Sequence, residues 1–163
     1  MSRRRLLALV PPLLLLPALP AAAGEDDDEH VARKGDIRVV HAWSRATTAE
    51  DGVVFMDIES LGGGDRLTGA TSELAAEVAI HGAVLEDGAL TSRPLGAIEI
   101  PAGGEFALEP GAVFLKLSGL RRPLVQGQGF EVELTFAEAG TLDVHVEVEA
   151  ADVTRHSHAG HPH

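Results

Sequence analysis

Two stretches near the C-terminal end of the chain alternate strictly between apolar and polar residues. They cover residues 129–136 and 141–148. The apolar positions are Phe130, Val132, Leu134 and Phe136 in the first stretch, and Leu142, Val144, Val146 and Val148 in the second. A period of two residues predicts strands with one packed and one solvated face. The four residues between them, Ala137–Gly140, suit a hairpin turn, so we expect an antiparallel pair of strands.

Short apolar runs continue the strand pattern upstream, from Ile37 onward. Gly, Asp, Pro and Thr separate these runs at intervals of about ten residues, which is typical of an all-β sandwich or barrel. Further strands are predicted over residues 37–41, 52–58, 66–71, 77–84, 89–93, 105–108 and 113–117. Trp43 and Met56 are expected in the hydrophobic core.

The first 23 residues have the composition of a secretory signal peptide. Arg3–Arg5 form a basic start, Leu6–Leu19 an apolar stretch interrupted by proline, and Ala21–Ala23 a small-residue cleavage site. The apolar stretch is shorter than the roughly 20 residues of a membrane span. We expect an exported, periplasmic protein with no membrane span after cleavage, sent through the Sec route, with the twin-arginine route as the alternative.

The remaining residues divide into three parts. Residues 24–36 are predicted to be an acidic, flexible leader, because a charge run at a terminus is typically solvated. Residues 37–149 are expected to form the β-sandwich domain. Residues 150–163 are expected to form a disordered tail rich in histidine.

Charge and cysteine content exclude several classes of function. The formal net charge of the chain is −12, and a strongly acidic surface repels nucleic acid. The chain contains no cysteine. Disulfides, thiolate metal sites and lipid attachment at a lipobox are therefore excluded for this sequence.

Four of the last eight residues are histidines, namely His156, His158, His161 and His163. Closely spaced neutral imidazoles chelate Cu(II), Ni(II) and Zn(II) without a folded scaffold. The tail therefore serves either to load or sequester a metal, or only as a segment that binds metal incidentally. The tail contains no methionine, which argues against a dedicated Cu(I) thioether site.

His81 is a separate candidate metal ligand, because it lies within a predicted strand at the opposite parity to Val78 and Ile80. A single histidine on a strand is more commonly a surface residue than a ligand. Motifs for catalysis are absent from the sequence, which has no G-x-S-x-G, no H-E-x-x-H and no phosphate-binding glycine loop. We therefore expect a protein that is not an enzyme.

Several motifs together resemble the periplasmic copper chaperones of the PCu(A)C family. The resemblance spans about residues 37–148. It is carried by His41–Thr47, Asp65–Ser72, Glu77–His81, Ile98–Gly104, Gly119–Leu124 and Glu133–Phe136. It implies a cupredoxin-like Greek-key β-sandwich that binds copper and passes it to a receiving protein, such as an oxidase assembly factor.

The copper ligands of that family follow the pattern H-x10-M-x21-H-x-M, which maps onto His81 in this chain. The next three ligand positions hold Ser92, Phe114 and Lys116 instead of Met, His and Met. Serine is a hard, weak ligand, phenylalanine has no lone pair, and lysine brings a positive charge. We expect the core copper site to be degenerate, with Cu(II) in the histidine tail favoured over Cu(I) in the core.

Two functions remain open. The first is an exported copper chaperone-like protein that binds and delivers or sequesters copper, with the tail as the main metal binder and His81 as a minor contributor. The alternative is a β-sandwich interaction or structural module that derives from the copper chaperones and binds no metal.

Overall fold

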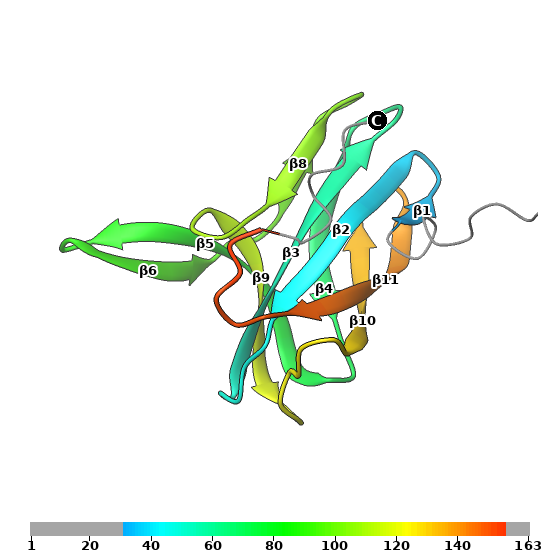
Figure 1. Ribbon diagram of the computed structural model, residues 1–163. Helices are drawn as coiled ribbons and strands as arrows, with labels where there is room; N and C mark the ends of the chain where they lie inside the picture. Colours follow the sequence, from blue (N-terminus) through cyan, green and yellow to red (C-terminus); the bar gives the residue numbers. More distant parts are fainter. Residues whose placement is uncertain (1–30, 156–163) are drawn as a thin grey trace, which may run out of the picture.

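The computed structural model describes residues 31–155, and this part of the chain is built from β-strands (Figure 1). The strands are β1 (Val31–Lys34), β2 (Ile37–Arg45), β3 (Asp51–Ser60), β4 (Asp65–Thr71), β5 (Ala75–Glu86), β6 (Ala89–Pro94), β7 (Ile98–Ile100), β8 (Glu105–Leu108), β9 (Val113–Leu120), β10 (Gly129–Phe136) and β11 (Gly140–Glu149). The all-β prediction is confirmed. Within the described residues there is no helix of the length and apolar character that a membrane crossing needs.

Hydrogen bonds join the strands in the order β6-β5-β9-β3-β2-β11-β10-β4-β7, with β1 added on β2 and β8 on β3. Neighbours in space are therefore often distant in sequence, as in a Greek key. All the pairs are antiparallel except β11 with β2, which run parallel. This parallel pair brings the C-terminal end of the domain beside its first long strand.

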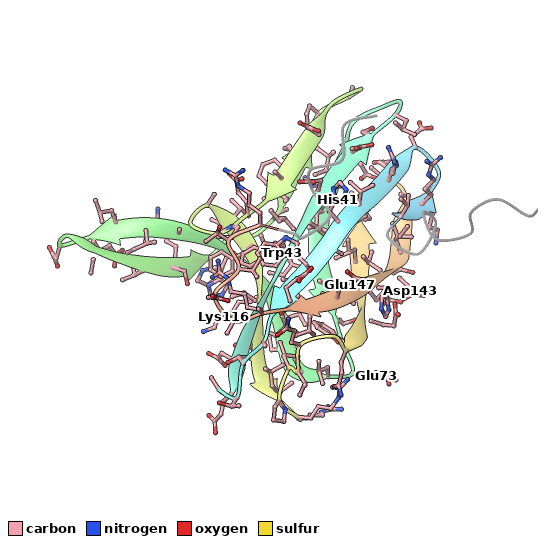
Figure 2. All side chains as sticks on the ribbon, viewed as in Figure 1. His41, Trp43, Glu73, Lys116, Asp143 and Glu147 are labelled. Atoms are coloured by element: carbon pink, nitrogen blue, oxygen red, sulfur yellow. The ribbon has the colours of Figure 1, made fainter. Side chains whose placement is uncertain are left out.

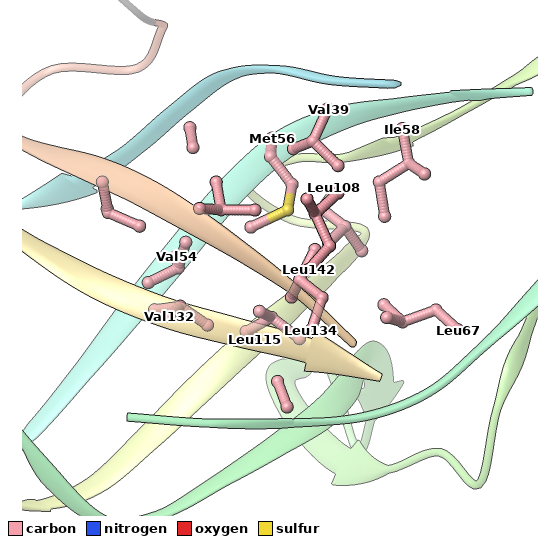
Figure 3. Close-up of a cluster of buried hydrophobic side chains, with 14 of the residues drawn as sticks. Val39, Val54, Met56, Ile58, Leu67, Leu108, Leu115, Val132, Leu134 and Leu142 are labelled. Atoms are coloured by element: carbon pink, nitrogen blue, oxygen red, sulfur yellow. The ribbon is translucent and has the colours of Figure 1, made fainter. Parts of the chain in front are cut away.

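The inward faces of these strands enclose one hydrophobic core (Figure 3). Val132 and Leu134 of β10 and Val146 of β11 are fully buried, as their alternation predicts. They pack in the same cluster as Val54, Met56 and Ile58 of β3, Leu67 of β4, Leu108 of β8 and Leu115 of β9. Met56 thus lies in the core as expected, whereas Trp43 is buried outside this central cluster.

One extra residue in β2 explains the position of Trp43. Val40 pairs with Asp57 and Trp43 with Phe55, so β2 advances by three residues where β3 advances by two. His41, at this β-bulge, has a φ of 53°, a left-handed value that is uncommon outside glycine. The bulge changes the parity of β2, and Trp43 pairs with Phe55 on the outer face of the sheet.

The strand prediction is incomplete in two places. Residues 31–34, assigned from sequence to the flexible leader, form β1 and pair with β2. Residues 98–100 form β7, which pairs with β4. Because β1 starts at Val31, the ordered domain begins six residues before the predicted boundary at Ile37.

The β5–β6 hairpin extends away from the body of the molecule (Figure 1). Its turn is formed by Asp87 and Gly88, whose φ values of 51° and 80° are both positive, as a two-residue type I′ turn requires. The hairpin fixes the register of β6 against β5, and this register positions the candidate site described next.

Candidate metal centre

His81 lies in β5 on the outer face of the sheet, between β6 and β9. Its neighbour Ile80 points into the core and is 3% exposed, so the predicted opposite orientation of the two side chains is observed. His81 pairs with Phe114 of β9 and with Pro94 of β6. Its Nδ1 lies 3.2 Å from Oγ of Ser92, within hydrogen-bonding distance.

The residues at the four copper-ligand positions of the chaperone pattern lie close together. The rings of His81 and Phe114 have centroids 6.1 Å apart, and Ser92 contacts His81 directly. Lys116 follows Phe114 on the same face of β9 and acts electrostatically on His81. The spacing inferred from the sequence therefore corresponds to one location in the fold, at the base of the β5–β6 hairpin.

The chemistry at this location does not fit a copper ion. Burial, and then the nearby Lys116 ammonium group, lower the pKa of His81, while Glu77 acts in the opposite direction. The imidazole is thus neutral at neutral pH and able to donate a lone pair, but a cation would meet the Lys116 charge. Lys116 is held in place by Asp51, with 3.0 Å between Nζ and Oδ2.

A replacement ligand set is not found in the part of the chain that the structure describes. Across residues 31–155, no three histidine, aspartate or glutamate side chains converge so that they could hold a metal ion. His41 on β2 lies next to Asp57 on β3, with 3.2 Å between Nδ1 of the histidine and Oδ2 of the aspartate. In Figure 2, His41 and Lys116 project from well-separated parts of the sheet.

An aromatic cluster that the sequence analysis did not predict adjoins His81. Phe114 meets Phe55 at 6.4 Å between ring centroids, and Phe55 meets Trp43 at 4.7 Å. The guanidinium group of Arg45 lies over both the Trp43 and Phe55 rings, 5.9 and 5.4 Å from their centroids. The motif residues Trp43 and Arg45 could have indicated this cluster, because arginine commonly stacks on tryptophan.

Arg45 also holds the segment that leads to the histidine tail. Its Nε donates a hydrogen bond of 2.8 Å to the carbonyl oxygen of Val153. Ala151 lines a cavity of about 400 Å³ together with Ser92, Phe114 and Lys116. The predicted tail ligands His156, His158, His161 and His163 lie outside the described residues, but the segment up to Val153 is anchored beside the His81 location.

Comparison with known proteins identifies the family. The sequence profile described as "Putative lipoprotein LpqE-like" matches residues 37–148. "Putative lipoprotein Lxx21020" of Leifsonia xyli subsp. xyli (strain CTCB07) is 34% identical over 115 residues, which cover 69% of each chain. The chain belongs to the LpqE-like family.

The fold of this LpqE-like protein is shared with solved PCuAC domains and with DR1885. "Copper-bound PCuAC domain from PmoF2" is 24% identical with a TM-score of 0.64, and covers 74% of this chain and 98% of its own. "apo PmoF2 PCuAC domain" is 25% identical with a TM-score of 0.65, covering 77% and 99%. "Solution structure of CuI-DR1885 from Deinococcus Radiodurans" is 21% identical with a TM-score of 0.55, covering 84% and 97%. The predicted cupredoxin-like Greek-key β-sandwich is therefore confirmed.

Proposed function

We propose that this LpqE-like protein is an exported copper chaperone-like protein, not an enzyme, that binds and delivers or sequesters copper mainly through its histidine tail. The fold is that of domains whose solved structures contain copper. The relatives are described as lipoproteins, which supports export. The receiving partner we propose is a second exported protein, for example an oxidase assembly factor.

One observation supports the tail as the main metal binder. At the location where the chaperone pattern would hold copper, His81 is the single remaining ligand of the expected type, next to Phe114 and the Lys116 ammonium group. One imidazole holds copper weakly, whereas several closely spaced imidazoles chelate it. The segment leading to the tail is fixed to Arg45 beside this location.

Copper titration of the mature chain tests the proposal. We expect submicromolar Cu(II) binding, lost when His156, His158, His161 and His163 are all replaced by asparagine. Replacement is preferred to truncation because it keeps the chain length. His81→Ala should change the affinity little, like the control His145→Ala, in which an exposed imidazole paired with Glu131 is removed.

The alternative, an interaction module without a metal, is favoured by the loss of ligand types at Ser92, Phe114 and Lys116. The same titration separates the two functions. Failure of the unmodified chain to bind Cu(II) would support the interaction module. Loss of binding in His81→Ala, with binding retained in the tail variant, would contradict the tail as the main binder.

A further inference from the structure

The cavity beside His81 is lined by positively charged and apolar side chains, unlike a copper site, which presents electron-pair donors to a cation. It measures about 400 Å³ and lies among β3, β6, β9 and the segment after β2. Phe114 and Val53 contribute apolar surface, whereas Arg45, Lys116 and Asp51 contribute charge. We call this space the cation-lined cavity, because its two positive groups outnumber its single carboxylate.

Both cations are held in fixed positions by the fold. The Arg45 guanidinium group lies over the rings of Trp43 and Phe55 and donates from Nε to Val153. The Lys116 ammonium group is bound by Asp51 at 3.0 Å. Groups that are already ordered lose little conformational entropy when they bind a ligand.

The two cations also keep hydrogen-bonding capacity. Lysine has three N–H donors and arginine has five. Within residues 31–155, Lys116 is paired only with Asp51, and Arg45 donates only from Nε. Donors therefore remain on both groups at the cavity wall, and charge-assisted hydrogen bonds to a carboxylate are the strong kind.

The apolar part of the cavity wall indicates which uncharged group a bound carboxylate would carry. The Phe114 ring occupies the position of a histidine ligand in the chaperone pattern and lines the cavity with the Val53 side chain. The volume lies near the lower end of the roughly 300–1,000 Å³ range of small-molecule sites. A compact apolar body, such as one aromatic ring or a short alkyl chain, suits this space.

We propose that the cation-lined cavity binds a small apolar monocarboxylate, with its carboxylate received by Lys116 and Arg45 and its apolar body against Phe114. This site is independent of copper binding by the tail. The net charge of −12 opposes any anion at long range, but at physiological ionic strength charges separated by more than about 8 Å are largely screened.

Benzoate is a suitable probe, because it combines one carboxylate with one ring. In a titration of the full mature chain followed by amide NMR, we expect shifts in residues 51–53 and 114–116. Benzyl alcohol has nearly the same body without the charge and should bind much more weakly. Equal binding of benzyl alcohol, or no shift at tens of millimolar benzoate, would overturn the proposal.

The two lysines of the chain provide a matched pair of variants. Lys116→Met keeps the length of the side chain and should weaken benzoate binding about tenfold, the effect of one charge-assisted hydrogen bond. Lys34→Met removes a lysine that donates to Thr141 at a site elsewhere on the sheet, and should have no effect. Lys116→Arg keeps the charge and should retain benzoate binding. This control shows that the loss in Lys116→Met comes from the missing charge and not from damage to the fold.

Copper titrations of the same variants keep the two proposals distinct. The four-asparagine tail variant should bind benzoate as the unmodified chain does, and Lys116→Met should keep its Cu(II) affinity. If Lys116→Met bound benzoate as tightly as the unmodified chain, the cavity proposal would be wrong whatever the tail does with copper.

Discussion

Asp65 shows how a single buried carboxylate connects two parts of the fold. It is 7% exposed at the start of β4. Its two carboxylate oxygens accept hydrogen bonds from the backbone N–H groups of Arg66, Glu138 and Ala139, at 2.6, 2.9 and 2.9 Å. Glu138 and Ala139 belong to the turn between β10 and β11, so Asp65 holds that turn against β4.

Replacing Asp65 by asparagine should destabilise the fold by about 2 kcal/mol, because an amide NH₂ group then faces backbone N–H donors in a buried site. Burial alone would raise the pKa of Asp65, but the backbone hydrogen bonds outweigh it and the pKa is lowered. Urea unfolding at neutral pH measures the effect. Asp143→Asn, which changes an exposed carboxylate on β11, is the control.

The lowered pKa gives this prediction a defined pH dependence. A carboxyl group whose native pKa lies below its unfolded value stabilises the fold above the unfolded value. That contribution is lost as the pH falls through the native value. The stability difference between the unmodified chain and Asp65→Asn should therefore shrink in acid. A difference that stays constant down to strongly acidic pH would show that ionised Asp65 is not the cause.

At the scale of strands, the sequence predicts the long amphipathic elements well. β10 and β11 have strict alternation, and their apolar residues are buried as expected. β7 has only three residues, too few for a period of two to be recognised. β1 consists largely of polar and small residues beside an acidic run, and it is ordered by pairing with β2, a contact that no local pattern reveals.

The candidate site was predictable only in part, for a physical reason. Motif spacing is sufficient to group His81, Ser92, Phe114 and Lys116, because each lies in a regular strand whose register is fixed. The aromatic cluster depends on the bulge at His41, which moves Trp43 to the outer face of the sheet. Apolar patterning cannot reveal that change of face, since Trp43 is buried on either side.

The strand register makes a restored copper site testable. The triple change Ser92→Met, Phe114→His and Lys116→Met returns two thioethers and an imidazole to positions around His81 and removes the opposing charge. In a chain that also has the four-asparagine tail, we expect about one equivalent of Cu(I) to bind, since thioethers are soft ligands suited to Cu(I). Competition with a Cu(I)-specific chelator measures this.

Two further chains act as controls for the triple change. The chain with only the asparagine tail should bind no Cu(I) in competition with the chelator. The triple change made together with His81→Ala should bind much more weakly, because one of the four ligands is gone. If both triple variants bound Cu(I) equally, the ligands would lie elsewhere, and the inferred register of the site would be wrong.

At the scale of the whole molecule, the domain and its tail should respond to acid at different pH. Imidazole has an ordinary pKa of about 6.5, and it must be neutral to bind a metal. The fold depends on carboxylates such as Asp65, whose pKa lies below the ordinary carboxyl value. As the pH falls, copper held by tail imidazoles should be released before the domain unfolds.

The pH of copper release also identifies the histidines that hold the metal. The pKa of His81 is lowered by burial and by Lys116, so protons compete for this imidazole at a lower pH than for an ordinary histidine. If the tail holds Cu(II), the midpoint of release should lie below the ordinary imidazole pKa, because the metal competes with protons, and it should not change in His81→Ala. Equilibrium dialysis measures bound copper, while the fluorescence of Trp43, the single tryptophan, reports whether the fold is intact. A shift of the midpoint in His81→Ala, with an unchanged midpoint in the four-asparagine tail variant, would place the copper in the domain and not in the tail.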